Sequence, residues 1–255
     1  MIGVFDSGVG GLSVLAEIRR LMPVADLTYV ADRSHAPYGT KNLEEVKGLA
    51  LDVAQMLVDK GATTLVVACN TASAAALESL RDRFPKVSVV GMEPAVKPAA
   101  IASATGVIGV FATAATFQGE LFDTVVSAHA SDVRVVTVAC PGWVDLVEKG
   151  ETGGTDVVEL VQAVVGPVLA GGADTLVLGC THFSFLKPTI ATVAGPEIRV
   201  IDPTPAVAAQ TSRVASEEGN GSLEFVASGS LEEFENLVDR LSELERLRPA
   251  LPFPT

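Results

Sequence analysis

The sequence has 255 residues, of which 48% are hydrophobic and 19% charged, and its net charge is −13. This length and composition predict a globular chain with room for one large domain or two of ordinary size. The negative charge argues against nucleic acid and anionic membrane surfaces as partners, because both attract basic patches. It leaves open a small anionic substrate held by backbone amides in a cleft.

The cellular location is predicted from what the sequence lacks. No apolar run approaches the roughly 18 residues of a membrane helix. The chain opens on an apolar strand, Met1–Phe5, with no basic segment before it, which predicts that there is no signal peptide. Three cysteines in such a chain favour reactive thiols over a disulfide framework. These features predict a cytoplasmic protein.

Short, continuously apolar and β-branched runs alternate along the chain with segments of helical period. The predicted strands are Ile2–Phe5, Leu27–Val30, Thr64–Ala68, Val87–Gly91, Gly106–Phe111, Val133–Val138, Thr175–Leu178, Arg199–Ile201 and Leu223–Ala227. The clearest helices between them are Leu43–Lys60, Thr71–Arg83, Thr116–His129 and Val157–Ala170. This alternation predicts parallel α/β sheets flanked by helices.

A last helix is expected after Ser230, which forms a capping box with Glu233. The apolar face of this helix is predicted to consist of Leu231, Phe234, Leu237, Val238, Leu241 and Leu244. The tail Arg248–Thr255 holds three prolines and is not expected to be helical.

The chain contains an internal repeat. Gly61–Ser73 aligns with Gly172–Ser184, and seven of the thirteen positions are identical, including Cys69 and Cys180. Ile2–Phe5 recurs as Ile108–Phe111. The sequence therefore reads as two similar halves, each with a cysteine just beyond a buried strand. Two thiols facing one cleft suit the transfer of a proton from one face of a carbon to the other.

The repeat predicts the domain boundaries. The first α/β domain is expected to comprise residues 1–92 together with 205–255, and the second residues 93–204. Ligands of parallel α/β sheets bind beyond the carboxyl ends of the strands. The loops that follow Phe5, Ala68, Phe111 and Leu178 are therefore expected to line one interdomain cleft.

The two cysteines are the strongest candidates for chemistry. Each follows a strand and is expected to start a helix, where unpaired N–H groups lower the pKa of a thiol. A single cysteine is most often a small buried hydrophobe, but two at equivalent positions of a repeat favour a functional pair. A structural zinc is a weaker alternative, because the sequence has no Cys-x-x-Cys pair and His182 lies only two positions from Cys180.

Other segments are weaker candidates. The glycine-rich loop Asp6–Gly11 could bring backbone N–H groups to an anion, or be only a tight turn capped by Asp6. Tyr38, in a loop rich in Pro and Gly, could close over a ligand. Thr113 and Thr116 could bind a carboxylate or cap a helix. We expect a structural role for Cys140 and a surface position for His129.

Taken together, these stretches resemble the glutamate racemases of the cofactor-independent aspartate/glutamate racemase superfamily. The resemblance extends from residue 2 to about residue 203, in the family's order. It is carried by Asp6–Gly11, Pro37–Gly39, Ala68–Thr71, Thr113 with Thr116, Cys140–Glu148 and Leu178–His182.

The resemblance implies an isomerase that inverts the α-carbon of glutamate without pyridoxal phosphate or metal. It implies that Cys69 is the base for D-glutamate and Cys180 the base for L-glutamate, assisted by Asp6 and His182 respectively. It further implies D-glutamate supply for peptidoglycan. The residues it implies for substrate binding are Asp6, Ser7, Tyr38, Gly39, Asn70, Thr71, Thr113, Thr116, Glu148, Thr181 and His182.

Three alternatives remain beside this interpretation. The substrate could be another acidic amino acid such as aspartate, because a pocket shorter by one methylene changes discrimination by only about 1–3 kcal/mol. The chain could be a binding protein that kept the fold and lost turnover, although both cysteines are present. A thiol redox protein would require a Cys-x-x-Cys pair. The sequence leaves the oligomeric state open, a homodimer included.

Overall fold

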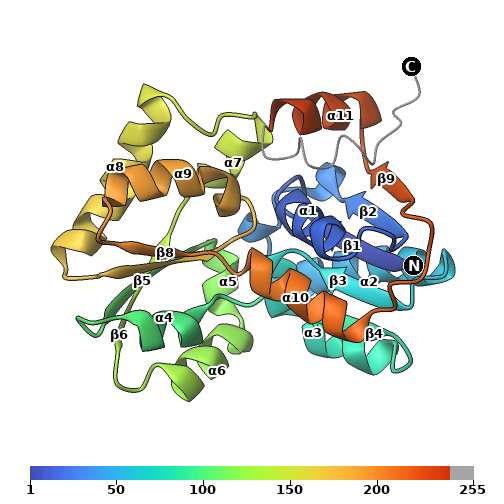
Figure 1. Ribbon diagram of the computed structural model, residues 1–255, viewed down its shortest axis with the longest axis horizontal. Helices are drawn as coiled ribbons and strands as arrows, with labels where there is room; N and C mark the ends of the chain where they lie inside the picture. Colours follow the sequence, from blue (N-terminus) through green and yellow to red (C-terminus); the bar gives the residue numbers. More distant parts are fainter. Residues whose placement is uncertain (242–255) are drawn as a thin grey trace.

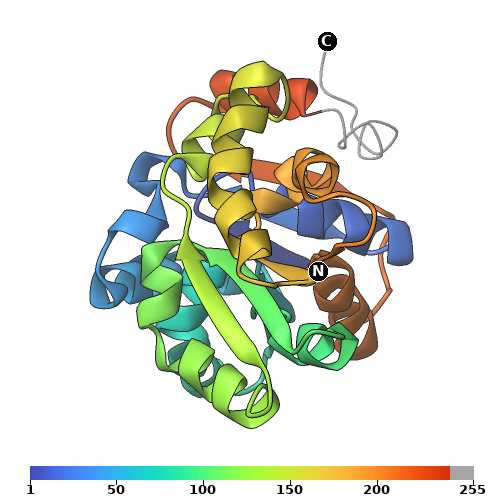
Figure 2. The same cartoon turned by 90° about the vertical axis from the view of Figure 1, so that its left-hand side faces the viewer.

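The computed structural model describes residues 1–241, which form two parallel sheets lying side by side, each flanked by helices (Figures 1 and 2). The predicted α/β class with two sheets is confirmed. Leu244 and the tail Arg248–Thr255 lie outside the described residues. The strands are β1 (Ile2–Asp6), β2 (Leu27–Ala31), β3 (Thr64–Val67), β4 (Ser88–Gly91), β5 (Val107–Ala112), β6 (Arg134–Ala139), β7 (Thr175–Gly179), β8 (Arg199–Ile201) and β9 (Leu223–Ala227).

The two sheets repeat one topology. The strand orders are β4-β3-β1-β2-β9 and β6-β5-β7-β8, and every neighbouring pair is parallel. β1 lies between β2 and β3, just as β5 lies between β6 and β7. The strands that precede the two cysteines, β3 and β7, therefore occupy equivalent positions. β9, from the C-terminal segment, extends the first sheet beside β2.

Helices cover both faces of each sheet. In the first sheet α1 packs beside α10 and α2 beside α3, and in the second α8 packs beside α9 and α4 beside α6. No helix within residues 1–241 is long and apolar enough to cross a membrane. The helices are α1 (Leu12–Leu21), α2 (Leu43–Asp59), α3 (Asn70–Arg83), α4 (Val96–Ala102), α5 (Ala114–Gln118), α6 (Glu120–His129), α7 (Trp143–Glu148), α8 (Thr155–Ala170), α9 (Phe183–Ala194), α10 (Thr204–Val214) and α11 (Leu231–Arg240).

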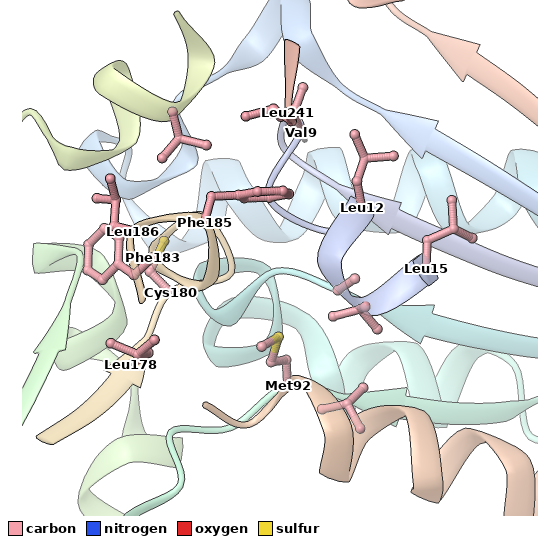
Figure 3. Packing of buried hydrophobic residues seen from close by; sticks show 14 of the residues in the cluster. Val9, Leu12, Leu15, Met92, Leu178, Cys180, Phe183, Phe185, Leu186 and Leu241 are labelled. Atoms are coloured by element: carbon pink, nitrogen blue, oxygen red, sulfur yellow. The ribbon is translucent and has the colours of Figure 1, made fainter. Parts of the chain in front are cut away.

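The largest hydrophobic core runs through both halves. It joins β1 residues such as Val4 to β7 residues such as Leu178, and it includes Cys180 and Phe183. Figure 3 shows Phe183 and Leu186 of α9 beside this cysteine, while the ring of Phe185 points toward Val9 and Leu12 of the first half. Each fully buried side chain of this size contributes about 1.5–3 kcal/mol of transfer free energy. The strand ends that carry the site are therefore held by rigid packing.

α11 begins as the capping signal predicts. The hydroxyl of Ser230 accepts a hydrogen bond from the N–H of Glu233 at 3.2 Å. Phe234, Leu237, Val238 and Leu241 of the predicted apolar face are buried. Leu231 is exposed, because it stands at the first position of the helix, so its place on the packed face is wrong. Phe234 stacks on Tyr29 with ring centroids 6.2 Å apart, which joins this last helix to β2.

The predicted helix Thr116–His129 is wrong as a single element. It is divided into α5 and α6 at Gly119, whose backbone is extended with ψ of 137°. A Cβ at Gly119 would lie 2.8 Å from Cβ of Ala74, so the glycine lets the two helices approach α3 closely. α5 packs against α3 and the turn Tyr38–Thr40 of the first half, which brings Thr113 and Thr116 beside Thr71.

Candidate active site

Cys69 lies at the first turn of α3, directly after β3. Its thiol sulfur accepts a hydrogen bond from the N–H of Ala72 at 3.4 Å, which makes Cys69 the N-cap of the helix. The thiol in turn donates to the hydroxyl of Ser7 at 4.0 Å. The residue is only 5% exposed. A cysteine so placed is held by two polar partners and shielded from bulk water.

Cys180 occupies the matching position after β7. Its Sγ lies 3.9 Å from Nδ1 of His182, and the residue is 6% exposed. The helix was predicted to start at Cys180, but α9 begins about one turn later, at Phe183. The N–H of Phe183 donates to the carbonyl of Cys180 at 3.0 Å. Both cysteines are close to the glycine-rich loop of the first half, because Ser7 contacts Cys69 and Asp6 accepts a hydrogen bond from Thr181, the residue after Cys180.

The pKa of Cys69 is shifted in the direction opposite to the sequence prediction. The helix N-terminus predicts a lowered pKa, but burial raises the pKa of this thiol, and the neighbouring Asp6 carboxylate raises it further. The hydrogen bond from Ala72 opposes this shift without cancelling it. Cys69 is therefore held as the protonated thiol.

Asp6 links the two halves at the ends of their sheets. One carboxylate oxygen accepts from the N–H of Gly8 at 2.7 Å, and the other accepts from the hydroxyl of Thr181 at 3.0 Å. Burial raises the pKa of Asp6, and the positive charge of His182 acts against that rise. Thr181 belongs to the second half, so this bond brings the Cys180 loop onto the glycine-rich loop of the first half.

Glu148, His182 and Cys180 form a hydrogen-bonded chain. Oε1 of Glu148 lies 2.7 Å from Nε2 of His182, whose Nδ1 faces Cys180. The same Oε1 accepts from the N–H of Val9 at 2.9 Å. The carboxylate at the end of α7 therefore orients the imidazole beside one thiol and also contacts the first half of the chain.

The pKa of His182 is raised well above its usual value. Burial alone lowers this pKa, but hydrogen bonds with Cys180 and Glu148 and the charge of Asp6 outweigh burial. The pKa of Glu148 is lowered, because its hydrogen bond with His182 and the imidazolium charge outweigh burial, which alone raises it. The pair is therefore an imidazolium and a carboxylate at neutral pH.

This ion pair predicts how stability depends on pH. Because the folded-state pKa of His182 lies above the unfolded value of about 6.5, its stabilising contribution is complete below about pH 6.5 and is lost as pH rises through the folded-state pKa. We expect the difference in unfolding free energy between wild type and His182→Gln to shrink as pH rises above neutrality. Denaturant unfolding over a pH series measures it, with His129→Gln as the control. A difference that grows with pH would contradict the assignment.

The glycine-rich loop is shaped for these contacts. A Cβ at Gly8 would overlap Oε1 of Glu148, and one at Gly10 would lie 2.6 Å from the hydroxyl oxygen of Thr181. Neither glycine has a positive φ. Close approach, and not backbone conformation, is therefore the reason that glycine stands here.

Three threonine hydroxyls meet between the halves. Oγ1 of Thr71, at the start of α3, lies 2.9 Å from Oγ1 of Thr113 and 3.3 Å from Oγ1 of Thr116. Thr113 also caps α5. A Cβ at Gly39 would lie 2.7 Å from Cβ of Thr113, so the Tyr38 loop packs against this hydroxyl cluster.

Asn70 and Tyr38, two more of the predicted site residues, lie outside this hydroxyl cluster. Asn70 is buried, its Nδ2 donates to the carbonyl of Met92 at 3.5 Å, and its Oδ1 has no hydrogen-bond partner within residues 1–241. Tyr38 is 1% exposed and donates its hydroxyl proton to Oδ2 of Asp32 at 2.6 Å. Burial, followed by the hydrogen bond to Asp32, raises the pKa of Tyr38.

Sequence reasoning missed Asp32. Besides Tyr38, it accepts from the hydroxyl of Ser228 at 2.8 Å and contacts Nδ1 of His35 at 2.9 Å. It therefore fixes the loop that carries Tyr38 and Gly39. The sequence does contain a signal that could have identified Asp32 as a site residue. Asp32 directly follows a buried strand, just as Asp6 ends one.

The other candidates are placed as expected. Cys140 is buried and donates to the carbonyl of Val138 at 3.4 Å, while His129 is exposed. Among residues 1–241, no group of three or more His, Cys, Asp or Glu side chains is arranged to hold a metal ion.

Two parallel sheets of one topology, each with a cysteine beyond the equivalent strand, define an α/β protein built from two similar halves. Comparison with known proteins agrees. Residues 2–211 match the Asp/Glu/Hydantoin racemase family. The glutamate racemase of Roseiflexus sp. (strain RS-1) is 44% identical over 248 residues, which cover 94% of this chain and 91% of that protein.

Solved structures show the same likeness. Bacillus anthracis glutamate racemase isoform RacE1 superposes with a TM-score of 0.86 at 31% identity and covers 95% of this chain and 94% of its own. Escherichia coli glutamate racemase, in complex with L-glutamate and the activator UDP-MurNAc-ala, superposes with a TM-score of 0.82 at 30% identity, with 94% of each chain covered. This chain belongs to the Asp/Glu/hydantoin racemase family and is an isomerase of the amino-acid racemase type.

Proposed function

We propose that this protein interconverts L- and D-glutamate by proton transfer between two cysteines. The observation that carries the proposal is the placement of Cys69 and Cys180 at equivalent strand ends of a repeated fold, with Ser7 in contact with Cys69 and Asp6 in contact with Thr181 beside Cys180. One cysteine, as thiolate, removes the α-proton, and the other, as thiol, donates a proton to the opposite face. The relatives named glutamate racemase support glutamate as the substrate.

The two thiols differ in their assisting groups. Cys69 takes the proton of D-glutamate and Cys180 that of L-glutamate. Asp6, whose pKa burial raises, is suited to accept the proton of the Cys69 thiol. His182, held cationic by Glu148, stabilises a thiolate at Cys180 or passes a proton back to it. Such positioned acids and bases each contribute about 10²–10⁴-fold to a rate.

The remaining residues bind the substrate. The buried acceptor Oδ1 of Asn70 suits the substrate ammonium, as does the carboxylate of Asp6. Hydroxyl groups suit the two carboxylates, and the free N–H groups at the start of α3 suit the developing negative charge at the α-carbon. The hydroxyl groups proposed for the carboxylates are those of Ser7, Thr71, Thr113, Thr116 and Thr181. Tyr38, whose hydroxyl is bonded to Asp32, and Gly39 are proposed to border the substrate through the loop that they share.

The alternatives have less support. Relatives that share a family with this chain over nearly its whole length carry the name glutamate racemase, which favours glutamate over aspartate. Both cysteines are present with polar partners, which disfavours a binding protein without turnover. A role in supplying D-glutamate for peptidoglycan, a cytoplasmic location and a homodimer stay predictions.

The direct experiment is incubation of the purified protein with each glutamate enantiomer in D₂O. We expect loss of optical rotation from either side and incorporation of deuterium at the α-carbon, because a solvent-exchanged thiol donates the new proton. Aspartate under the same conditions is the control for substrate choice. Faster racemisation of aspartate than of glutamate would favour the alternative substrate.

Activity is expected without added pyridoxal phosphate and after exhaustive treatment with EDTA. The reason is that two thiols replace the electron sink and proton carrier that a cofactor would supply. The measurement is the racemisation rate before and after chelation, together with an absorption spectrum of the purified protein. An absorbing Schiff base, or inactivation by EDTA that added metal reverses, would refute cofactor-independent chemistry.

A further inference from the structure

Glu148 is held by groups from both halves of the chain. It is the last residue of the short helix α7, which lies beside α11 (Figure 1). Its Oε1 is occupied by His182 and by the N–H of Val9. Its Oε2 lies 3.7 Å from Nε of Arg33, in the short turn after β2. The orientation of this carboxylate is therefore decided by three separate contacts.

Arg33 has an unusual environment for an arginine. Its side chain is 20% exposed, yet its Nε is buried and makes no hydrogen bond to any group within residues 1–241. The Glu148 carboxylate is the negative group paired with it. Burying a guanidinium nitrogen without a hydrogen bond costs free energy. Some of that cost is offset by attraction to Glu148, because partly buried charges are weakly screened.

The space around this pair would let the carboxylate move. A cavity of about 210 Å³ lies beside it, lined by Arg33, Glu148 and residues of α11. Arg240 also lines this cavity, but the arginine paired with Glu148 is Arg33. The charge of Arg33 favours the ionised carboxylate and opposes its displacement into the cavity.

We propose that Arg33 is a positioning residue for the Cys180 side of the reaction, acting through Glu148 and His182. The inference rests on the proposed function. Arg33 fixes Glu148, Glu148 fixes His182, and His182 faces the sulfur of Cys180. The polar contacts of Cys69 are with Ser7 and Ala72, which stand outside this chain of contacts. Loss of Arg33 therefore affects one thiol more than the other.

To test this role of Arg33, we need a reaction whose rate depends on only one of the two thiols. Enantiomers have equal free energy, so kcat/KM for racemisation has the same value in both directions whatever the mutation. A β-chloro glutamate analogue separates the two sides, because removal of its α-proton expels chloride and needs only one base. The L analogue reports on Cys180 and the D analogue on Cys69.

The experiment compares Arg33→Met, which keeps length without charge, with Arg33→Lys, which keeps the charge. Arg33→Met should slow elimination from the L analogue by about tenfold, less than the loss of a general acid or base, and change the D analogue by less than about twofold. The kcat for L-glutamate should fall while KM stays within about twofold. Arg33→Lys should recover most of the rate. Arg20→Gln, which removes an exposed arginine paired with Glu17 at 2.8 Å, is the matched control.

The outcomes are distinct. Equal losses on both analogues, as misfolding would cause, or no loss on either, would overturn the role of Arg33. A lysine variant no better than the methionine variant would overturn the part assigned to its charge. If the wild-type protein racemises neither enantiomer of glutamate, the proposed function itself fails, and this is seen before any variant is made.

Discussion

Replacing either Cys69 or Cys180 by serine is expected to lower kcat/KM for glutamate racemisation by about 10³-fold or more. A hydroxyl ionises far less readily than a thiol near neutral pH, so the substituted side can no longer remove the α-proton. Both residues are buried, and serine is close in size, so the fold should persist. The measurement is circular dichroism of each glutamate enantiomer over time, with unfolding curves to show that the variants remain folded.

The two serine variants should differ in handedness. With the β-chloro analogues, the Cys69 variant should act only on the L form, through Cys180, and the Cys180 variant only on the D form, through Cys69. The prediction follows from thiols at equivalent strand ends in two facing halves. If both variants eliminate from the same enantiomer, the opposed placement is wrong.

Cys140 offers the matched control. It is as buried as the other two cysteines, and its thiol donates to the carbonyl of Val138, a bond that serine can also make. Cys140→Ser should retain most of the racemisation rate. Comparable inactivation of all three variants would point to a general sensitivity to cysteine replacement and would remove the argument for a catalytic pair.

The strands could be predicted because burial on both faces leaves a continuous apolar run, which Thr175–Gly179 and Ile2–Asp6 both show. The repeat predicted two similar halves, and the structure gives the two sheets matching strand orders. The break at Gly119 was missed, because the close approach of Gly119 to Ala74 of another helix is visible only in the folded chain. Helical periodicity indicates which residues of a segment are buried. It does not indicate where another helix packs closely against that segment.

The candidate site shows the same limit. The cysteines, Asp6 and His182 stand at strand ends in recognisable stretches, so the sequence located them. Arg33 and Asp32 act only through side chains brought near them by folding. The pKa of Cys69 depends on burial and on the charge of Asp6, which outweigh the local effect of the helix N-terminus. Properties that depend on such distant contacts require the structure.

Gly10→Ala is expected to lower kcat/KM by about 10²-fold, the effect of misplacing reacting groups by about 1 Å. Gly10 has no positive φ, so its backbone accepts alanine, but the new methyl would overlap Nδ1 of His182, the atom that faces Cys180, and crowd Thr181. The imidazole must move, and the Cys180 side loses its acid-base partner. Overpacking should also cost about 1–3 kcal/mol of unfolding free energy, measured by denaturant unfolding.

Gly48→Ala is the matched control for this last change. Gly48 is exposed within α2, and a Cβ there would have no atom within 4 Å. Alanine should leave the kinetics unchanged and raise the unfolding free energy by about 0.5–1 kcal/mol, because it restricts the unfolded chain and favours helix. If Gly10→Ala keeps the wild-type rate, the close approach of the glycine-rich loop to His182 is not needed for proton transfer. The role assigned to the Glu148–His182–Cys180 chain would then fail with it.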